Sequence, residues 1–402
     1  MLSNFGGQRG LFSPMAVELS YVLITPYSIR KSRTGGILSR LLSRTGLELV
    51  AARMFSPGAE LVEKYAAGMV TDTDPVHRAA QETIQKYVRK HFSAREAGTK
   101  RRVLMLVFRG EDAVKKVREV VGHILNERSS GETIRDTFGD YITDPDGRVI
   151  YFEPAVLTAP DVASARADLK LWAQYSDSDG GLLEKAIDYP PTASVQKTLV
   201  LIKPDNFRFP NARPGGVIDL FSRTGLYIIA CNVLHMSVAQ AEEFYGPVLA
   251  VLQDKLRGRA GEMAKKALEP VFEMTFTPEV EKALGEVLGP INGRENWEDI
   301  VKFMSGRRPS DCPADIRSQP GTEKCLALIY QGEDAVRKIR EVLGPTDPSK
   351  APFGTIRKEF GQTIMVNAAH ASDAPENAQR EMGIIRIEEN NFRTLIENWL
   401  AQ

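Results

Sequence analysis

An internal repeat constrains the fold of this 402-residue chain more than any other feature. The segment GEDAVKKVREVVG at 110–122 returns as GEDAVRKIREVLG at 332–344, with ten of thirteen positions identical. The segment SRTGL at 43–47 returns unchanged at 222–226. These separations far exceed the period of a solenoid, which is about 20 to 50 residues. The sequence therefore predicts a duplicated domain, whose second copy carries about 43 extra residues between these landmarks.

Each copy contains four short apolar runs separated by amphipathic stretches. In the first copy the runs predict strands at 21–24, 48–53, 103–108 and 149–152. In the second copy they predict strands at 198–202, 227–234, 325–330 and 363–366. After the second strand of each copy a helix is expected to begin at Ser56 or at Ser237, where Gln240 completes a capping box. This βαββαβ order predicts an α+β protein of two tandem ferredoxin-like domains, with antiparallel sheets and helices packed on one face.

The domain boundaries follow from the same pattern. Residues 1–18 are expected to form a flexible leader, and residues 19–172 the first domain. The stretch 173–196 is rich in Ser, Asp, Gly and Pro, which is typical of a linker. The second domain is expected at 197–402, with an inserted helical segment at about 246–294.

Composition excludes several classes of protein. The 52 basic and 52 acidic residues give a formal net charge of zero, which argues against a nucleic-acid or membrane-surface partner. No stretch approaches the roughly 20 apolar residues of a membrane span, and the N-terminus has no signal-peptide pattern. Cys231, Cys312 and Cys325 have no CxxC spacing and are expected to be free thiols. We therefore expect a cytoplasmic protein.

The segment NAAHASD at 367–373 carries the most informative histidine. His370 follows the apolar run at 363–366 and precedes a helix, for which Asp373 and Glu376 predict a capping box. We expect His370 on this strand-to-helix connection, where a side chain can face a cleft. A nucleophilic imidazole needs cations around an incoming phosphate, and three are available upstream at Lys203, Arg340 and Arg357.

Five short segments of the second copy together resemble the nucleoside diphosphate kinase family. They are IKPD at 202–205, GPTDP at 344–348, GTIR at 354–357, NAAHASD at 367–373 and the terminal NW at 398–399. The resemblance covers residues 197–402, and residues 20–172 resemble a degenerate copy of the same domain. It implies that ATP and other nucleoside di- and triphosphates are the substrates and that Mg²⁺ is the cofactor.

The resemblance also implies a role for each residue at the phosphate. His370 would take the γ-phosphate of a nucleoside triphosphate and pass it to a diphosphate in a ping-pong cycle. Glu381 would orient the imidazole ring. Lys203, Arg340 and Arg357 would hold the phosphates and offset the charge that develops during transfer.

Further residues are implied around the rest of the nucleotide. Thr346 would contact a phosphate, and Asn367, with Lys203, would hold the ribose hydroxyls. Trp297 would stack on the base, which suits broad base specificity. Tyr245 and Ser372 match residues beside the catalytic histidine. Asp373 would approach Mg²⁺ indirectly.

Structural alternatives stay open for several of these residues. Asp373 could serve only as a helix N-cap, and Glu381 could be a solvated helix residue. Trp297 could be a core aromatic. Arg340 could form a structural ion pair, because Arg118 is its identical counterpart in the first copy.

The first copy lacks the catalytic set and is predicted to be inactive. Thr25 stands where the second copy has Lys203. Phe152, or Glu153 if the register slips by one, is predicted at the histidine position, and Val149 replaces the asparagine. Weak nucleotide binding by the first copy stays open, because three polar residues remain there: Arg118, Arg135 and Tyr65.

The leading hypothesis is an active kinase whose two domains form an intramolecular pseudo-dimer, with further homo-oligomerisation left open. A competing hypothesis is a non-catalytic nucleotide-binding or regulatory module. A third is protein-histidine phosphotransfer, in which the same phosphoimidazole serves another acceptor.

Overall fold

The computed structural model of the protein describes residues 17–93, 100–124, 131–146 and 149–402. The chain forms two compact units. The first comprises Met1–Arg33, Arg40–Gly180 and Asn391–Gln402, and the second comprises Thr34–Ser39 and Gly181–Asn390. The leader expected at 1–18 lies mostly outside the described residues, but its last two residues already belong to the first strand. Within the described ranges, no helix is long and apolar enough to cross a membrane.

The sheet of the second unit has the ferredoxin-like strand order. Its strands are β7 (Val195–Ile202), β8 (Tyr227–Leu234), β9 (Cys325–Glu333) and β10 (Ala369–Ala371). They are ordered β10-β7-β9-β8, and their pairings are antiparallel. The helices of this unit are α8 (Arg213–Phe221), α9 (Val238–Phe272), α10 (Pro278–Ser305), α11 (Ala335–Leu343), α12 (Ile356–Phe360) and α13 (Pro375–Ile384). Because consecutive residues from Thr198 to Ile202 are all buried, both faces of the central strand β7 are covered.

The first unit repeats this arrangement. Its main sheet has the order β2-β3-β1-β6, built from β1 (Val17–Ile24), β2 (Glu48–Phe55), β3 (Val103–Glu111) and β6 (Val156–Leu157). A separate two-stranded ribbon consists of β4 (Asp140–Thr143) and β5 (Val149–Glu153). The helices are α1 (Pro26–Arg30), α2 (Thr34–Thr45), α3 (Ala59–Ala67), α4 (Pro75–His91), α5 (Ala113–Val121), α6 (Ile134–Phe138) and α7 (Val162–Gln174), although the first six residues of α2 belong to the second unit. The duplicated ferredoxin-like fold predicted from the repeat is therefore confirmed.

The last helix of the chain, α14 (Asn391–Leu400), belongs to the first unit. It contacts α7 and β2. Phe392 and Ile396 are buried in the aromatic core of that unit, where Phe55 lies edge-on to Phe392 at 5.6 Å between ring centroids. Trp172 also packs edge-on against Phe55, with 4.9 Å between their ring centroids. A segment that is remote in sequence thus completes the core of the first unit.

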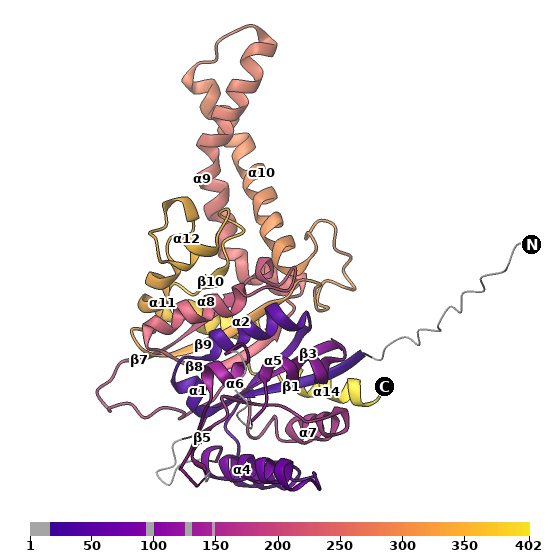
Figure 1. Ribbon diagram of the computed structural model, residues 1–402. Helices are drawn as coiled ribbons and strands as arrows, with labels where there is room; N and C mark the ends of the chain where they lie inside the picture. The colour runs from indigo at the N-terminus through magenta and orange to yellow at the C-terminus, as the bar shows by residue number, and fades with distance from the viewer. Residues whose placement is uncertain (1–16, 94–99, 125–130, 147–148) are drawn as a thin grey trace, which may run out of the picture. The chain divides into compact units, whose positions relative to one another are not determined.

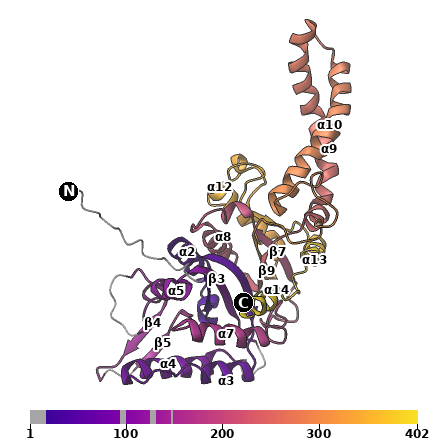
Figure 2. The ribbon, with the colours of Figure 1, turned by 90° about the vertical axis from the view of Figure 1, so that its right-hand side faces the viewer.

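The prediction of the fourth strand of each copy was wrong. Residues 149–152 lie in β5, which pairs with β4 outside the main sheet (Figure 2). Residues 363–366 form no strand. The edge strands are instead β6 and β10, a few residues further along each chain segment. These strands contain only two and three residues, so no alternation or apolar run of useful length marks them.

Helix starts were predicted with mixed success. The capping box at the start of α9 is confirmed: the Gln240 amide donates to Ser237 Oγ at 3.0 Å, and the Ser237 amide donates to Gln240 Oε1 at 3.1 Å. The start of α3 at Ser56 was wrong, since Gly58 is its N-cap.

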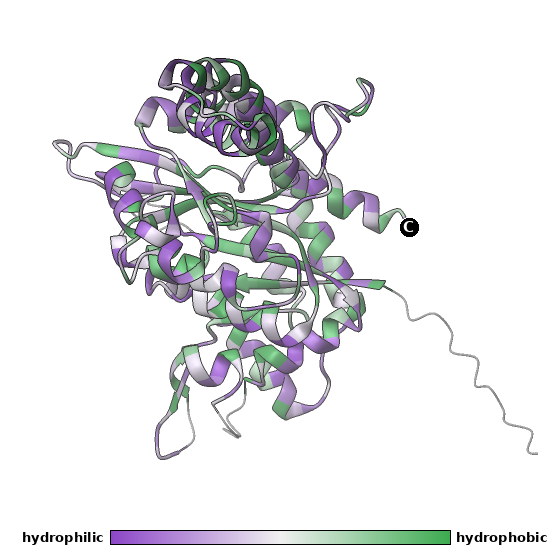
Figure 3. Ribbon diagram, turned by 90° about the horizontal axis from the view of Figure 1, so that it is seen from above, coloured by the Kyte–Doolittle hydropathy of each residue, from purple (hydrophilic) through white to green (hydrophobic). Residues whose placement is uncertain are grey.

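The extra residues of the second unit form a long antiparallel hairpin of α9 and α10, which lie side by side (Figure 1). Glycines allow the two backbones to meet. A Cβ added to Gly285 would lie 2.5 Å from the Arg257 carbonyl oxygen, and one added to Gly289 would lie 2.6 Å from Arg257 Cα. A Cβ on Gly293 would lie 2.5 Å from Gln253 Cα. Hydrophobic and hydrophilic residues are interspersed along both helices (Figure 3).

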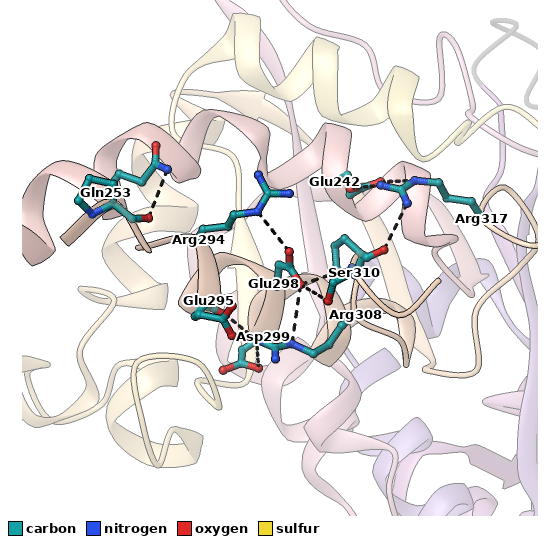
Figure 4. A network of polar contacts seen from close by, with 11 residues as sticks. Glu242, Gln253, Arg294, Glu295, Glu298, Asp299, Arg308, Ser310 and Arg317 are labelled. Atoms are coloured by element: carbon teal, nitrogen blue, oxygen red, sulfur yellow. Dashed lines mark hydrogen bonds and ion pairs between the residues drawn. The ribbon is translucent and has the colours of Figure 1, made fainter. Parts of the chain in front are cut away.

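Polar contacts fasten the base of this hairpin to the loop after α10 (Figure 4). Glu298 is buried and accepts a hydrogen bond from Ser310 Oγ at 2.6 Å. It also pairs with Arg294 at 3.4 Å. In the same region, Arg317 donates to Glu242 of α9 at 2.9 Å. Several polar contacts therefore hold the base of the hairpin to the loop that follows α10.

Candidate active site

His370 lies in the middle of β10, opposite Leu201 of β7. Its Nε2 is 2.9 Å from Glu381 Oε2, and Ser372 Oγ donates to the same carboxylate oxygen at 2.6 Å. Because a carboxylate only accepts hydrogen bonds, this contact assigns the proton to Nε2 and leaves a lone pair on Nδ1. Nδ1 has no hydrogen-bond partner among the residues that the structure describes. This is the arrangement of a nucleophilic imidazole with an orienting partner.

Glu381 therefore does not fit the alternative of a solvated helix residue. It is only 5% exposed, on α13 beneath the imidazole. The expected strand-to-helix connection was placed slightly wrongly, since His370 is in the strand itself. The residue before the strand, Ala368, has φ 70°, a left-handed conformation that is uncommon outside glycine.

The capping box predicted at Asp373 is not formed. Pro375 occupies the first turn of α13 and Ala374 is the N-cap, with no side-chain cap bond. Asp373 is thus one residue too early to cap the helix, and its Oδ1 accepts a hydrogen bond from Asn377 at 2.7 Å instead. This bond, followed by a backbone hydrogen bond and then the nearby charge of Arg340, lowers the pKa of Asp373 against the opposing effect of burial.

Lys203 is buried directly after β7. Its Nζ donates to the Met365 carbonyl at 2.5 Å and to Asn367 Oδ1 at 3.0 Å. Burial lowers the pKa of Lys203 from 10.5 to about 8. Its Nζ also lies 4.8 Å from the ring centroid of Phe303, a cation–π contact that the sequence did not reveal. No short motif marks Phe303, which lies in the last turn of α10, beyond the predicted insertion.

Two guanidinium groups lie close to each other in the same unit. Arg357 is buried and donates to the carbonyls of Gly344 at 3.0 Å and Ala369 at 3.2 Å. Burial, followed by the charge of Arg340, lowers the pKa of Arg357 to about 10. Arg340 is exposed and makes no ion pair with any described residue, so the structural ion pair considered for it is not found. Two neighbouring guanidinium groups that form no ion pair with a described carboxylate favour an anion.

Asn367 connects three parts of the site. Its Nδ2 donates to the carbonyls of Thr346 at 3.1 Å and Ile364 at 2.7 Å, while its Oδ1 holds Lys203. Thr346 is exposed on the loop that this bond restrains, so its hydroxyl is available to a ligand.

Aromatic rings border the histidine on the α9 side. The ring of Phe244 is 5.0 Å and that of Tyr245 is 6.1 Å from the His370 ring. Burial raises the pKa of Tyr245, which is therefore a neutral phenol. Trp297 is 6% exposed and its Nε1 donates to the Tyr245 carbonyl at 2.9 Å. These surroundings are those of the core-aromatic alternative, and stacking of Trp297 on a base stays a prediction.

The residues around Asp373 suit a magnesium ion that arrives with phosphate. Within the described part of the chain, no group of three or more His, Cys, Asp or Glu side chains could hold a metal on its own. Mg²⁺ typically keeps several waters and binds through one or two carboxylates and substrate phosphates. A single carboxylate near Arg340 fits this mode, in which Asp373 acts through water.

The first unit has different residues at the corresponding positions, and the predicted register there was wrong. Leu157 pairs with Leu23 as His370 pairs with Leu201, so Leu157, not Phe152 or Glu153, occupies the histidine position. Ala155 mirrors Ala368, with φ 61° and a carbonyl that accepts the Thr25 amide at 3.2 Å. Pro154 then stands in the place of the asparagine, not Val149. Glu153 is buried nearby and accepts from Thr25 Oγ1 at 2.8 Å.

A ferredoxin-like fold with a carboxylate-oriented histidine among buried cations defines the class as phosphotransferases. A sequence model described as nucleoside diphosphate kinase matches residues 18–172 and 314–390. The chain belongs to the nucleoside diphosphate kinase family.

Known relatives of this chain carry the same family name. A nucleoside diphosphate kinase of Nitrosospira multiformis is 32% identical over 199 residues, which is 50% of this chain and 98% of the relative. One of Halorhodospira halophila is 30% identical over 189 residues, which is 47% of this chain and 91% of the relative. Among solved structures, an NDP kinase from Pyrobaculum aerophilum shares 27% identity over 47% of this chain and 94% of its own, with a TM-score of 0.31.

Proposed function

We propose that the second unit transfers the γ-phosphate of a nucleoside triphosphate to a nucleoside diphosphate through a phosphohistidine on His370. The observation that carries this proposal is the His370–Glu381 contact of 2.9 Å, which leaves Nδ1 as the basic nitrogen. Nδ1 attacks the γ-phosphorus, and the bond to the β,γ-bridging oxygen breaks with its electron pair on the departing diphosphate. A second diphosphate then attacks the phosphoimidazole, and the N–P electron pair returns to Nδ1.

The neighbouring residues each do one part of this work. Glu381 keeps the proton on Nε2 and stabilises the positive charge that develops on the ring. Lys203, Arg340 and Arg357 hold the phosphates and offset negative charge on the transferring group. Mg²⁺ supplies further charge neutralisation at the phosphates when bound, with Asp373 as its indirect partner.

The outer parts of the nucleotide meet the remaining predicted residues. The Thr346 hydroxyl contacts a phosphate, and Asn367 positions Lys203 and the ribose hydroxyls. Trp297, whose Nε1 donates to the Tyr245 carbonyl, stacks on the base.

The first unit takes no part in transfer, because Leu157 carries no nucleophile. We propose that it serves as the scaffold of an intramolecular pseudo-dimer; the duplicated fold supports this. The three cysteines form no disulfide, which supports a reducing compartment such as the cytoplasm.

The test is a labelling and chase experiment on the full chain. The wild type, His370→Ala and a control, His77→Ala, are incubated with γ-labelled ATP and Mg²⁺ and then with GDP. Acid-labile label should form on the wild type and on the control, whose histidine is exposed on α4, and GDP should remove it as GTP. His370→Ala should take up no label.

Three results would oppose the proposal, and the first two would favour the competing hypotheses. Label that forms but is not chased by GDP would indicate transfer to another acceptor. Nucleotide binding without any label would indicate a non-catalytic module. Label remaining on His370→Ala would show that a different residue is the nucleophile.

A further inference from the structure

The first unit contains a cavity of about 600 Å³ at the position that the active site occupies in the second unit. Leu157 lines it at the histidine position. Arg118 and Arg135 also line it, and the repeat aligns them with Arg340 and Arg357. The volume is in the range of small-ligand sites, which is about 300 to 1,000 Å³.

The two arginines of this cavity lack a carboxylate partner. Arg118 is exposed and makes no hydrogen bond or ion pair with any residue that the structure describes. Arg135 donates to the carbonyls of Gly122 at 2.6 Å and Val156 at 3.2 Å, while its Nε has no partner. Burial, followed by the charge of Arg118, lowers the pKa of Arg135 to about 10. An anion bound between the two guanidinium groups would relieve their repulsion.

Carboxylates at the cavity do not cancel these charges. Glu119, Asp136 and Asp168 line it, but none of them forms an ion pair with Arg118 or Arg135 in the described part of the chain. Asp136 instead acts on Arg40, whose pKa it raises against the larger lowering effect of burial. The cavity therefore presents unneutralised positive charge on one wall.

Further residues that line the cavity are apolar: Met69, Ile84, Leu157, Ala159 and Pro160. Among the polar lining residues, the Tyr21 hydroxyl donates to Asp168 Oδ2 at 2.7 Å and lies 3.1 Å from the Tyr65 hydroxyl. Asp168 follows Leu157 by the same eleven residues that separate Glu381 from His370. Without an imidazole to orient, this carboxyl is used to hold the tyrosines.

We propose that this cavity binds a nucleotide and retains it without transferring its phosphate. The phosphates lie against Arg118 and Arg135, and the ring of the base lies against the apolar side chains that line the cavity. The cavity keeps the cations that attract a phosphate and lacks the nucleophile that would accept it. This inference does not depend on transfer at His370, because binding and turnover are measured separately.

The experiment counts ADP binding to the full chain by equilibrium dialysis. The wild type should bind two ADP molecules per chain. Arg118→Gln should weaken one of them by about tenfold or more, the worth of a hydrogen bond to a charged group, and should keep the labelling of His370. Arg340→Gln should weaken the other. Lys116→Gln, on the same helix but not lining the cavity, is the matched control and should leave both sites intact.

A second variant and a second probe guard against misinterpretation. Ser164→Trp, which introduces a bulky ring at the cavity, should also remove the first-unit site. Inorganic pyrophosphate should compete with ADP there in the wild type and fail to do so in Arg118→Gln. ADP binding that is unaffected by both Arg118→Gln and Ser164→Trp would overturn the proposal, whether the wild-type chain binds one ADP or two and whether or not His370 is labelled.

Discussion

The charge state of Lys203 leads to a quantitative prediction about stability. Burial lowers the pKa of its amine to about 8 in the folded chain, whereas a lysine in an unfolded chain has a pKa of about 10.4. Between these two values, the unfolded state keeps a proton that the folded state has released. The free energy of unfolding must therefore rise with pH across this window. The full difference is worth about 3 kcal/mol.

Urea unfolding of the nucleotide-free protein would measure this effect. Wild type and Lys203→Met should be compared at pH values from 7 to 10.5, because methionine fills a similar volume and does not titrate. The stability of the wild type relative to the variant should gain about 1.4 kcal/mol per pH unit between pH 8 and 10. Below pH 7 the difference should be constant.

A second variant tests whether the slope comes from the titrating amine. Lys203→Leu should give the same pH dependence relative to the wild type as Lys203→Met. Parallel stability curves for the wild type and both variants would refute the reasoning. Nucleotide affinity should fall over the same window as pH rises, because a neutral amine attracts a phosphate less than an ammonium does.

Three other predictions address the site, the hairpin and the first unit. Glu381→Gln should lower kcat by roughly 10- to 100-fold, since a hydrogen bond to a charged group is worth about 1.5 to 3 kcal/mol. Steady-state assays with ATP and GDP would measure this loss, and an undiminished rate would show that the contact is unimportant. Gly289→Ala should destabilise the chain by about 1 to 3 kcal/mol through overpacking, because its new Cβ would meet α9 at 2.6 Å. Gly258→Ala, where nothing lies within 4 Å, should instead raise the melting temperature slightly; equal effects of the two would contradict the close packing. Leu157→His should place an imidazole in the first unit without restoring transfer. In a His370→Ala background, the Leu157→His variant should therefore form no acid-labile phosphate. Acid-labile label on this double variant would show that a histidine alone suffices.

Most of the fold could be predicted because most strands are long and strongly apolar. The runs at 198–202 and 103–108 are buried at consecutive positions and are recognisable in the sequence as unbroken or nearly unbroken apolar runs. The strands β6 and β10 could not be found this way. Whether such a short segment forms a strand depends on its pairing with a neighbouring strand and not on its local sequence. The error at β6 then displaced the predicted register of the first unit, so that Phe152 and not Leu157 was assigned to the histidine position.

The site itself divides along similar lines. The contact between His370 and Glu381 was expected from motif resemblance, and it joins the strand β10 to the helix α13 that follows it. Phe303 and Phe244 were missed, since their proximity to Lys203 and His370 depends on how the insertion folds back. Tryptophan is a residue type that can stack on a base. The burial of Trp297, however, is set by tertiary packing that sequence patterns do not encode.

The placement of α14 affects the order in which the chain can mature during synthesis. Phe392 and Ile396 lie in the core of the first unit, yet they are translated only after the whole second unit. A ribosome-bound chain must therefore leave part of an apolar surface near Phe55 and Trp172 uncovered until residues 391–402 emerge. A nascent first unit is thus exposed to chaperones and proteases for the time needed to translate about 210 further codons. Loss of the last dozen residues would be felt most in the part of the protein that was made first.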